Sequence, residues 1–346
     1  MRVAFVSAET VHHTDTGATD RLARVASGLA ARGHELTHVT AAWWEGDFQD
    51  FESGGITYRG IDPGPVPTLG VPSAVGRAIA KIEPDIVHAD CGSSTWLMGA
   101  WLGAKLAGAG LLLDCDGPAP KSWPARRILS RADSLLVPSE LVRTRIREQG
   151  IDGGRVEVVP TGIDVDRIAD TEPAAGGDIV YSRRLDENAN LETLLLALAE
   201  FRRHGWEATI IGDGPKRSAY ERQARDLRIE DRVQFVGSLP VEERLRYFVN
   251  AHVYVHTAEE TPFAHDLLRA LAAGAVAIVE YHEDSSAHEL VETEKRGFTA
   301  TSPAELTRRL GTAGELERRC LVEEFDRFDD EAILERYLDI YRSIRG

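Results

Sequence analysis

The sequence predicts an α/β protein that is built from parallel sheets. A strand at Val253–His256 is followed by a helix and by a second strand at 275–280, and a strand–helix–strand unit of this kind forms a parallel sheet. The helix carries Phe263, Leu267 and Leu271 at a four-residue spacing, which indicates one buried face. The length of 346 residues is sufficient for two domains of ordinary size.

The turns of this unit are expected to border a ligand site. Thr261 and Pro262 form a typical helix start, a capping hydroxyl followed by proline, and Gly274 is expected to end the helix. Ligands of parallel sheets bind at the carboxyl ends of the strands. The turns 257–261 and 282–286 lie there, each before a helix N-terminus that attracts anions. We therefore expect a phosphorylated ligand at this edge.

Charge and composition limit the possible partners. The chain has 56 acidic and 40 basic residues, a net charge of −16, so nucleic acid is not an expected partner. The 43 % hydrophobic content is typical of a globular protein. Only five basic residues are lysines. An acidic, lysine-poor surface favours a halophilic source, because high salt screens the self-repulsion; a genome rich in arginine codons is the alternative.

The cysteines and the apolar stretches predict a cytoplasmic protein. Cys91, Cys115 and Cys320 form no CxxC pair and no metal set with histidines, so we expect reduced, mostly buried thiols. The first strand, at 3–7, does not have the form of a signal peptide. Residues 96–113 are apolar, but they contain Lys105 and four glycines and divide into a helix and a strand. No membrane span is expected there.

The remaining elements follow in chain order. An amphipathic helix has Leu22, Val25, Ala26 and Leu29 on its inner face and ends at Gly33, and a second helix is capped by Ser139. Residues 45–72 predict a short hairpin and a loop. Further strands are expected at 34–40, 82–89, 111–115, 178–182, 208–211 and 233–240, and further helices at 241–250, 303–310, 315–324 and 331–344. Residues 165–177 lack periodicity and predict a linker between domains at 1–164 and 178–329, with a final helix in 330–346.

Several motifs resemble one enzyme family. The stretch TPFAHDLLRALAAGAVAIV and the later AHELVE are similar to the nucleotide-sugar-binding segment of the retaining GT-B-fold glycosyltransferases of family four. In that segment the family has two glutamates, which fall on Thr261 and Arg269. RGHELTHVT, IEPDIVHA, VEVVPTGID and IIGDGP resemble other family motifs, so the resemblance covers nearly the whole chain. It implies two Rossmann-like domains that face a central cleft, with the C-terminal helix returning to the first domain.

The resemblance also implies site residues. Asp116 stands where the family commonly has a histidine, and Arg184 matches an arginine that holds the donor diphosphate, whereas Ala189 takes the place of a family lysine. Asp116 and Glu260 are the expected catalytic residues. The expected donor-binding residues are Gly17, Arg183, Arg184, Gly212, Asp213, Gly214, Lys216, Gly237, Ser238, Thr261, Pro262, Phe263, Arg269 and Glu289.

The implied function is sugar transfer, with retention, from a nucleotide sugar to a glycan, a lipid-linked acceptor or a small molecule. The family usually needs no metal, because cations and helix N-termini balance the leaving diphosphate, so neither a metal nor a cofactor is expected. Peripheral membrane association is compatible with a lipid-linked acceptor. The alternative is a catalytically weak GT-B protein that binds a nucleotide or sugar beside another transferase, since Thr261, Arg269 and Ala189 replace family ligands.

Overall fold

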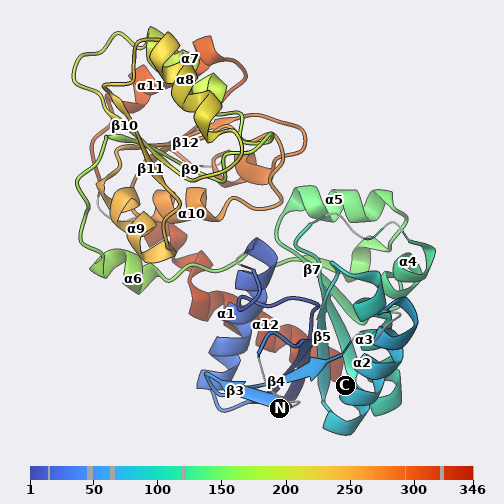
Figure 1. The fold of residues 1–346 in the computed structure, drawn as a ribbon. Coiled ribbons are helices and arrows are strands. Elements are labelled where there is room, and N and C mark those ends of the chain that lie inside the picture. The colour runs from blue at the N-terminus through green and yellow to red at the C-terminus, as the bar shows by residue number, and fades with distance from the viewer. Residues whose placement is uncertain are drawn as a thin grey trace. The chain divides into compact units, whose positions relative to one another are not determined.

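The chain forms two compact units. The computed structural model describes residues 1–14, 16–44, 50–62, 67–117, 120, 122–292, 294–319 and 323–345. Unit 1 comprises Met1–Gly162 and Asp330–Gly346, and unit 2 comprises Ile163–Asp329 (Figure 1). Among the described helices, none combines the length and the apolar character that crossing a bilayer would need.

Unit 1 is organised around an eight-stranded sheet with the order β3-β4-β2-β1-β5-β6-β7-β8, in which only the β3–β4 pair is antiparallel. The strands are β1 Arg2–Val6, β2 Glu35–Ala41, β3 Asp50–Ser53, β4 Ile56–Ile61, β5 Ile86–Asp90, β6 Gly110–Asp114, β7 Ser134–Val137 and β8 Val156–Val158. The chain builds outward from β1 on one side and from β5 on the other. The switch point, where parallel sheets bind ligands, is therefore the β1–β5 boundary.

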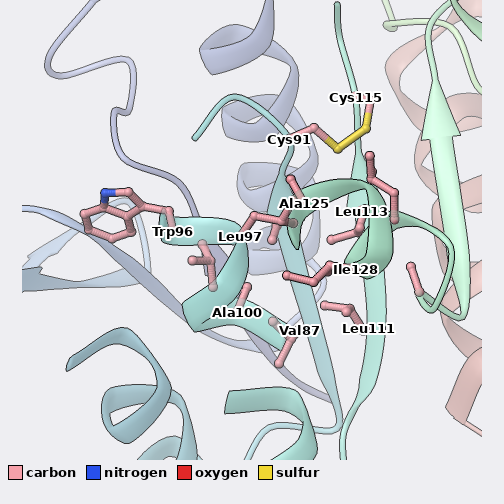
Figure 2. Packing of buried hydrophobic residues seen from close by; sticks show 14 of the residues in the cluster. Val87, Cys91, Trp96, Leu97, Ala100, Leu111, Leu113, Cys115, Ala125 and Ile128 are labelled. Carbon is pink, nitrogen blue, oxygen red and sulfur yellow. A yellow bond between two sulfur atoms is a disulfide. The ribbon is translucent and has the colours of Figure 1, made fainter. Parts of the chain in front are cut away.

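Helices cover both faces of this sheet (Figure 1). They are α1 Gly17–Ala31, α2 Pro67–Ile82, α3 Ser94–Ala107, α4 Trp123–Leu129, α5 Glu140–Glu148 and α12 Asp330–Arg345. Because successive strand residues point to opposite faces, Phe5 and Leu112 pack with α1 and α12, whereas Leu111 and Leu113 pack with α3 and α4. Figure 2 shows the second of these cores. The return of the C-terminal helix to the first domain is confirmed.

Unit 2 has a six-stranded, fully parallel sheet with the order β11-β10-β9-β12-β13-β14. The strands are β9 Ile179–Ser182, β10 Ala208–Ile211, β11 Val233–Gly237, β12 Val253–His256, β13 Val276–Glu280 and β14 Gly297–Ala300. The helices are α6 Val165–Asp170, α7 Leu191–Glu200, α8 Arg217–Asp226, α9 Val241–Asn250, α10 His265–Ala272 and α11 Pro303–Ala313. Short 3₁₀ turns are η1 Gly153–Arg155 in unit 1 and η2 Ser286–Leu290 and η3 Glu323–Phe328 in unit 2.

The ends of several elements follow the capping residues and glycines that the sequence analysis identified. Ser139 accepts a hydrogen bond from the Val142 amide and caps α5, and Gly33 follows α1 with a φ of 77°. Gly274 follows α10 with a φ of 94°, in the left-handed region that favours glycine. The hairpin expected within residues 45–72 is β3–β4, although residues 45–49 and 63–66 lie outside the described part of the chain.

Four predictions about secondary structure are wrong. The loop expected up to residue 72 overlaps helix α2, which begins at Pro67. Thr261 does not start a helix, because its backbone pairs with the Ser285 segment and α10 begins only at His265. Residues 165–177 are not wholly irregular: α6 forms there, capped by the Asp164 side chain, which accepts a hydrogen bond from the Arg167 amide. The helix expected at 315–324 is not formed by residues 315–319, and residues 320–322 lie outside the described part of the chain.

The expectation of reduced thiols is also wrong for two of the three cysteines. Cys91 and Cys115 form a disulfide (Figure 2). They directly follow the neighbouring parallel strands β5 and β6, which brings their Cα atoms to 5.0 Å, within the range a disulfide requires. Cys320 lies outside the described residues. Because disulfides are rare in a reducing cytosol, this pair removes one observation on which the cytoplasmic prediction rested.

Candidate active site

The switch point of unit 2 lies between β9 and β12. From β9 the chain continues through β10 and β11 on one side, and β12 to β14 build the other side. The segments that follow these strands therefore diverge at their carboxyl ends and leave room for a ligand there. Arg183 directly follows β9, and the segment 257–264 follows β12.

Arg183 is joined to the segment after β12. Its Nη1 donates to Thr261 Oγ1 at 3.1 Å and its Nη2 donates to the Glu260 carbonyl at 2.9 Å, while its Nε is buried without a partner. Thr261 is buried, and its hydroxyl also contacts His256 Nε2 at 3.1 Å. Burial and the Arg183 charge lower the pKa of His256 to about 3. His256 is therefore neutral at pH 7, and the charge of this cluster comes from Arg183.

The other cations predicted for the donor site are paired with carboxylates. Arg184 is 73 % exposed and lies 3.8 Å from Asp186, and Lys216 lies 2.9 Å from Glu187. Arg217, which follows Lys216 and was not among the predicted donor residues, pairs with Asp213 and Glu221.

Arg269 is also not available to bind a phosphate at the surface, because it is buried in α10. Its Nη1 donates to Asp266 Oδ1 at 2.9 Å, and Asp266 Oδ2 accepts from Ser182 Oγ and Arg244 Nη1. Burial alone would raise the pKa of Asp266, but Arg244 and Arg269 hold it below its usual value. Among these predicted cations, Arg183 is the one with no carboxylate oxygen within 4 Å in the described structure.

The glycines of the next turn allow a close approach to Arg183. Gly212 has a φ of 143°, and a Cβ atom on it would collide with the Arg183 carbonyl. Gly214 has a φ of 155°, and a Cβ atom on it would collide with the Leu185 carbonyl. The Gly212 amide donates to the Gly237 carbonyl at 2.8 Å. The IIGDGP motif thus packs its backbone against the segment that carries Arg183.

The remaining predicted residues of unit 2 differ in how deeply they are buried and in whether they approach Arg183. The side chain of Glu260 is exposed, and Ser238 is exposed after β11. Pro262 is half-buried and its carbonyl accepts from Ser286 Oγ at 2.7 Å, whereas Phe263 is buried in the core with α10. Glu289 is half-buried in η2. Thr261 and Glu260 are therefore the predicted residues that contact Arg183.

Glu280 was not among the predicted site residues. It ends β13 and is buried; its Oε2 accepts from Asn190 Nδ2 at 2.9 Å and its Oε1 from Thr193 Oγ1 at 3.3 Å. Burial raises the pKa of Glu280. Asn190 has a φ of 47°, and the neighbouring Ala189 carbonyl accepts from Tyr181 and Thr257. These bonds fix the segment that begins at Arg183. The signal that could have identified Glu280 in the sequence was a glutamate at the end of an otherwise apolar strand.

In unit 1 the predicted residues lie at the carboxyl edge of the sheet. Asp116 follows β6 and is half-buried; its Oδ1 is buried without a hydrogen-bond partner. Burial raises the pKa of Asp116 to about 7, against the opposing effect of Arg21. Gly17 is the first residue of α1, after the capping residue Thr16. Asp90, at the end of β5, was not predicted; burial raises its pKa to about 6.

A buried polar cluster supports this edge, and the sequence analysis missed it. Arg21 Nε donates to both carboxylate oxygens of Asp114, at 2.8 and 2.9 Å, and Arg21 Nη1 donates to Thr161 at 3.2 Å. Tyr337 of α12 donates its hydroxyl to Asp114 at 2.7 Å. His88 Nε2 lies 3.5 Å from the same carboxylate. Two features of the sequence could have indicated this cluster: a lone arginine on the buried face of α1, and an aspartate in the strand LLLD.

Two family models match successive parts of the chain. Residues 16–162 match the Glycosyl transferase 4-like domain, and residues 166–319 match the Glycosyl transferases group 1 model. The chain belongs to the GT-B glycosyltransferases of the family-four type. Within this glycosyltransferase, Arg183, Thr261 and the IIGDGP turn lie in the second matched region, and Asp116 lies in the first.

Named relatives and solved structures agree with this placement. The GDP-mannose-dependent alpha-(1-6)-phosphatidylinositol monomannoside mannosyltransferase of Mycolicibacterium smegmatis is 28 % identical over 251 residues, 66 % of this chain and 65 % of that relative. Sucrose-phosphate synthase from Thermosynechococcus elongatus superposes with a TM-score of 0.78 at 19 % identity, over 99 % of this chain and 98 % of that chain. Anabaena HepE in complex with UDP and glucose gives a TM-score of 0.74 at 18 % identity, over 99 % and 100 %.

Proposed function

We propose that this glycosyltransferase transfers a sugar from a nucleotide sugar to a hydroxyl of an acceptor, with retention at the anomeric carbon. The observation that carries the proposal is Arg183, a cation at the switch point of unit 2 that has no carboxylate partner among the residues the structure describes. Its planar guanidinium can contact two phosphate oxygens of the donor diphosphate. In a chain of net charge −16, such a local cation is what brings a diphosphate to the surface.

The donor contacts follow from this anchor. The diphosphate lies against Arg183, and the glycine-rich turn at Gly212–Gly214 holds the Arg183 segment in place, because its glycines pack against the Arg183 and Leu185 carbonyls. Arg183 balances the charge that develops on the leaving diphosphate, and we propose that the reaction requires no metal ion. The named relatives support the donor class: one uses GDP-mannose, and one structure holds UDP and glucose.

Asp116 is proposed to contact a sugar hydroxyl from unit 1. Its carboxyl has a pKa of about 7, so at neutral pH it can donate or accept a hydrogen bond. Glu260 is the second proposed catalytic residue, because its side chain is exposed beside the Arg183–Thr261 contact. During transfer the anomeric bond to the diphosphate breaks, the acceptor oxygen takes its place, and the acceptor proton passes to the leaving phosphate.

Among acceptors we favour a lipid-linked one, because the mycobacterial relative is named for a phosphatidylinositol mannoside. The protein would then act at a membrane surface. Glycans and small molecules are the other acceptor classes that the transfer assay below includes.

The test is a screen of sugar nucleotides by thermal shift in molar salt, followed by a transfer assay with the stabilising donor. A bound donor stabilises the folded state by mass action, so at least one GDP- or UDP-sugar should raise the melting temperature, and free phosphate should not. Asp116→Asn should keep this shift and lose turnover. No shift with any nucleotide sugar would overturn the proposed donor class, and full turnover in Asp116→Asn would remove Asp116 from the mechanism.

A further inference from the structure

One stretch of unit 1 has the opposite charge to the rest of the chain. Between residues 91 and 132 the acidic residues are Asp114 and Asp116, and the basic residues are Lys105, Lys121, Arg126, Arg127 and Arg131. The stretch therefore has three more basic than acidic residues, whereas the whole chain has a net charge of −16. It contains α3, β6 and α4.

The two acidic residues do not offset these cations at the surface. Asp114 is buried and bonded to Arg21, and the inner oxygen of Asp116 is buried. Lys105, Arg126 and Arg127 are exposed, and in the described part of the chain they have no carboxylate oxygen within 4 Å. The outward charge of α3 and α4 is therefore positive. Lys121 lies outside the described residues.

The same two helices expose large apolar side chains. Figure 2 shows Leu97 and Ala100 of α3 and Ala125 and Ile128 of α4 packed among the strand residues of the core. The outward positions carry large apolar side chains instead, namely Met98, Leu106 and Trp123, which are 36 %, 60 % and 71 % exposed.

Trp123 lies where the two helices meet. Ser94 Oγ and Ser122 Oγ, at the starts of α3 and α4, are 3.0 Å apart, and the Arg127 guanidinium lies 5.3 Å from the centre of the Trp123 ring. Arg126 also donates to the Gln149 carbonyl, so neither arginine is paired with a carboxylate among the described residues. An exposed tryptophan beside such arginines is the combination that membrane–water interfaces favour, since the ring enters the headgroup layer while the cations contact lipid phosphates.

We propose that the outer face of α3 and α4, defined by Met98, Lys105, Leu106, Trp123, Arg126 and Arg127, docks on an anionic lipid membrane. The charges of this face complement acidic lipid headgroups, and its apolar side chains favour a bilayer over a nucleic acid. Docking by this face does not depend on catalysis. The consequence that unit 1 receives its acceptor from the membrane rests on the proposed function.

The experiment is co-sedimentation with vesicles, at the lowest salt concentration at which circular dichroism shows the protein folded. Vesicles of phosphatidylcholine alone are compared with vesicles that contain about one third phosphatidylglycerol. The wild type should sediment with the anionic vesicles and not with the neutral ones. Trp123→Ser, and separately Arg126→Ser/Arg127→Ser, should weaken this binding by about tenfold or more.

Two control measurements distinguish specific docking through this face from nonspecific vesicle binding and from an effect on catalysis. Tyr281→Ser removes a 50 % exposed aromatic residue of unit 2 and should leave vesicle binding unchanged. Trp123→Ser should retain transfer to a water-soluble acceptor, so that a failure of docking is distinguishable from a failure of the proposed function. No binding to anionic vesicles, equal binding by Trp123→Ser and wild type, or tighter binding to duplex RNA than to vesicles would each overturn the proposal.

Discussion

The buried Arg21–Asp114 pair permits a quantitative prediction about unit 1. Both side chains are 2 % exposed, and Arg21→Met would leave the Asp114 carboxylate with Tyr337 and His88 as its partners. Removing one partner of a buried ion pair costs about 3–5 kcal/mol. For domains of this size each kcal/mol lowers the melting temperature by about 2–4 °C. Melting of unit 1 should therefore fall by about 6–20 °C at pH 7.

The sign of the pH dependence gives a second check on the same variant. Burial alone would raise the pKa of Asp114, but Arg21 and His88 hold it at about 2, below the ordinary value of 3.8. A carboxyl whose pKa is lower in the folded state contributes stability above pH 4, and this contribution is lost as the pH falls toward 2. Without Arg21, protonation of Asp114 relieves the buried charge. The difference between wild type and Arg21→Met should thus be largest at pH 7 and smaller at pH 4.

Urea unfolding monitored by circular dichroism at the two pH values is the assay. Arg24→Met is the control on the same helix, because Arg24 pairs with the partly exposed Asp20 and Asp330 and should cost no more than about 1 kcal/mol. Arg21→Met/Asp114→Leu should recover much of the loss, since it removes both charges. A loss below about 1 kcal/mol in Arg21→Met, or a double variant as unstable as the sum of the single variants, would refute the reasoning.

Three further outcomes are expected. Asp116→Asn should raise the melting temperature more at pH 8 than at pH 5, because burial raises the pKa of Asp116 to about 7 and the stability of the protonated form is lost as the pH rises through that value; an equal change at both pH values in a thermal scan contradicts this. Gly212→Ala should weaken donor binding and stability together in calorimetry, since its Cβ would collide with the Arg183 carbonyl. Gly311→Ala, inside α11 where a Cβ meets nothing within 4 Å, should leave donor binding unchanged and raise stability slightly. Dilution from molar to about 0.1 M salt should lower the melting temperature substantially, given the charge of −16; an unchanged melting curve would remove the halophile hypothesis.

The fold could be predicted from the sequence because its signals are local. Apolar strands, Ser139 as a helix cap and glycines such as Gly33 and Gly274 each act within a few residues, and the structure confirms them. Thr261 shows the limit of this reasoning. Its hydroxyl is a good helix cap by type, but it bonds instead to Arg183, 78 positions earlier in the chain, and to His256 at the end of β12.

The site was less predictable because its charges are assigned by tertiary contacts. Arg183 and Arg184 are adjacent and chemically identical, yet one lies against Thr261 and the other is exposed beside Asp186. Arg269 fits a donor site by its position in the motif, but Asp266 pairs with it within α10. The Arg21–Asp114 pair joins residues 93 positions apart, and the Cys91–Cys115 pair depends on strand neighbourhood. Residue type alone does not reveal such pairings.

The most direct test of the account is calorimetry of donor binding by wild type, Arg183→Ala and Arg184→Ala. The sequence motif favours Arg184 as the diphosphate anchor, whereas the contacts of the structure favour Arg183. A charge-assisted hydrogen bond contributes about 1.5–3 kcal/mol, so Arg183→Ala should weaken donor binding about ten- to a hundredfold. Arg184→Ala should bind the donor and melt like the wild type, whereas Arg183→Ala should also lower the melting temperature modestly, because it loses the hydrogen bonds to Thr261 and the Glu260 carbonyl. Unchanged affinity in Arg183→Ala, together with a large loss in Arg184→Ala, would contradict the proposed donor site.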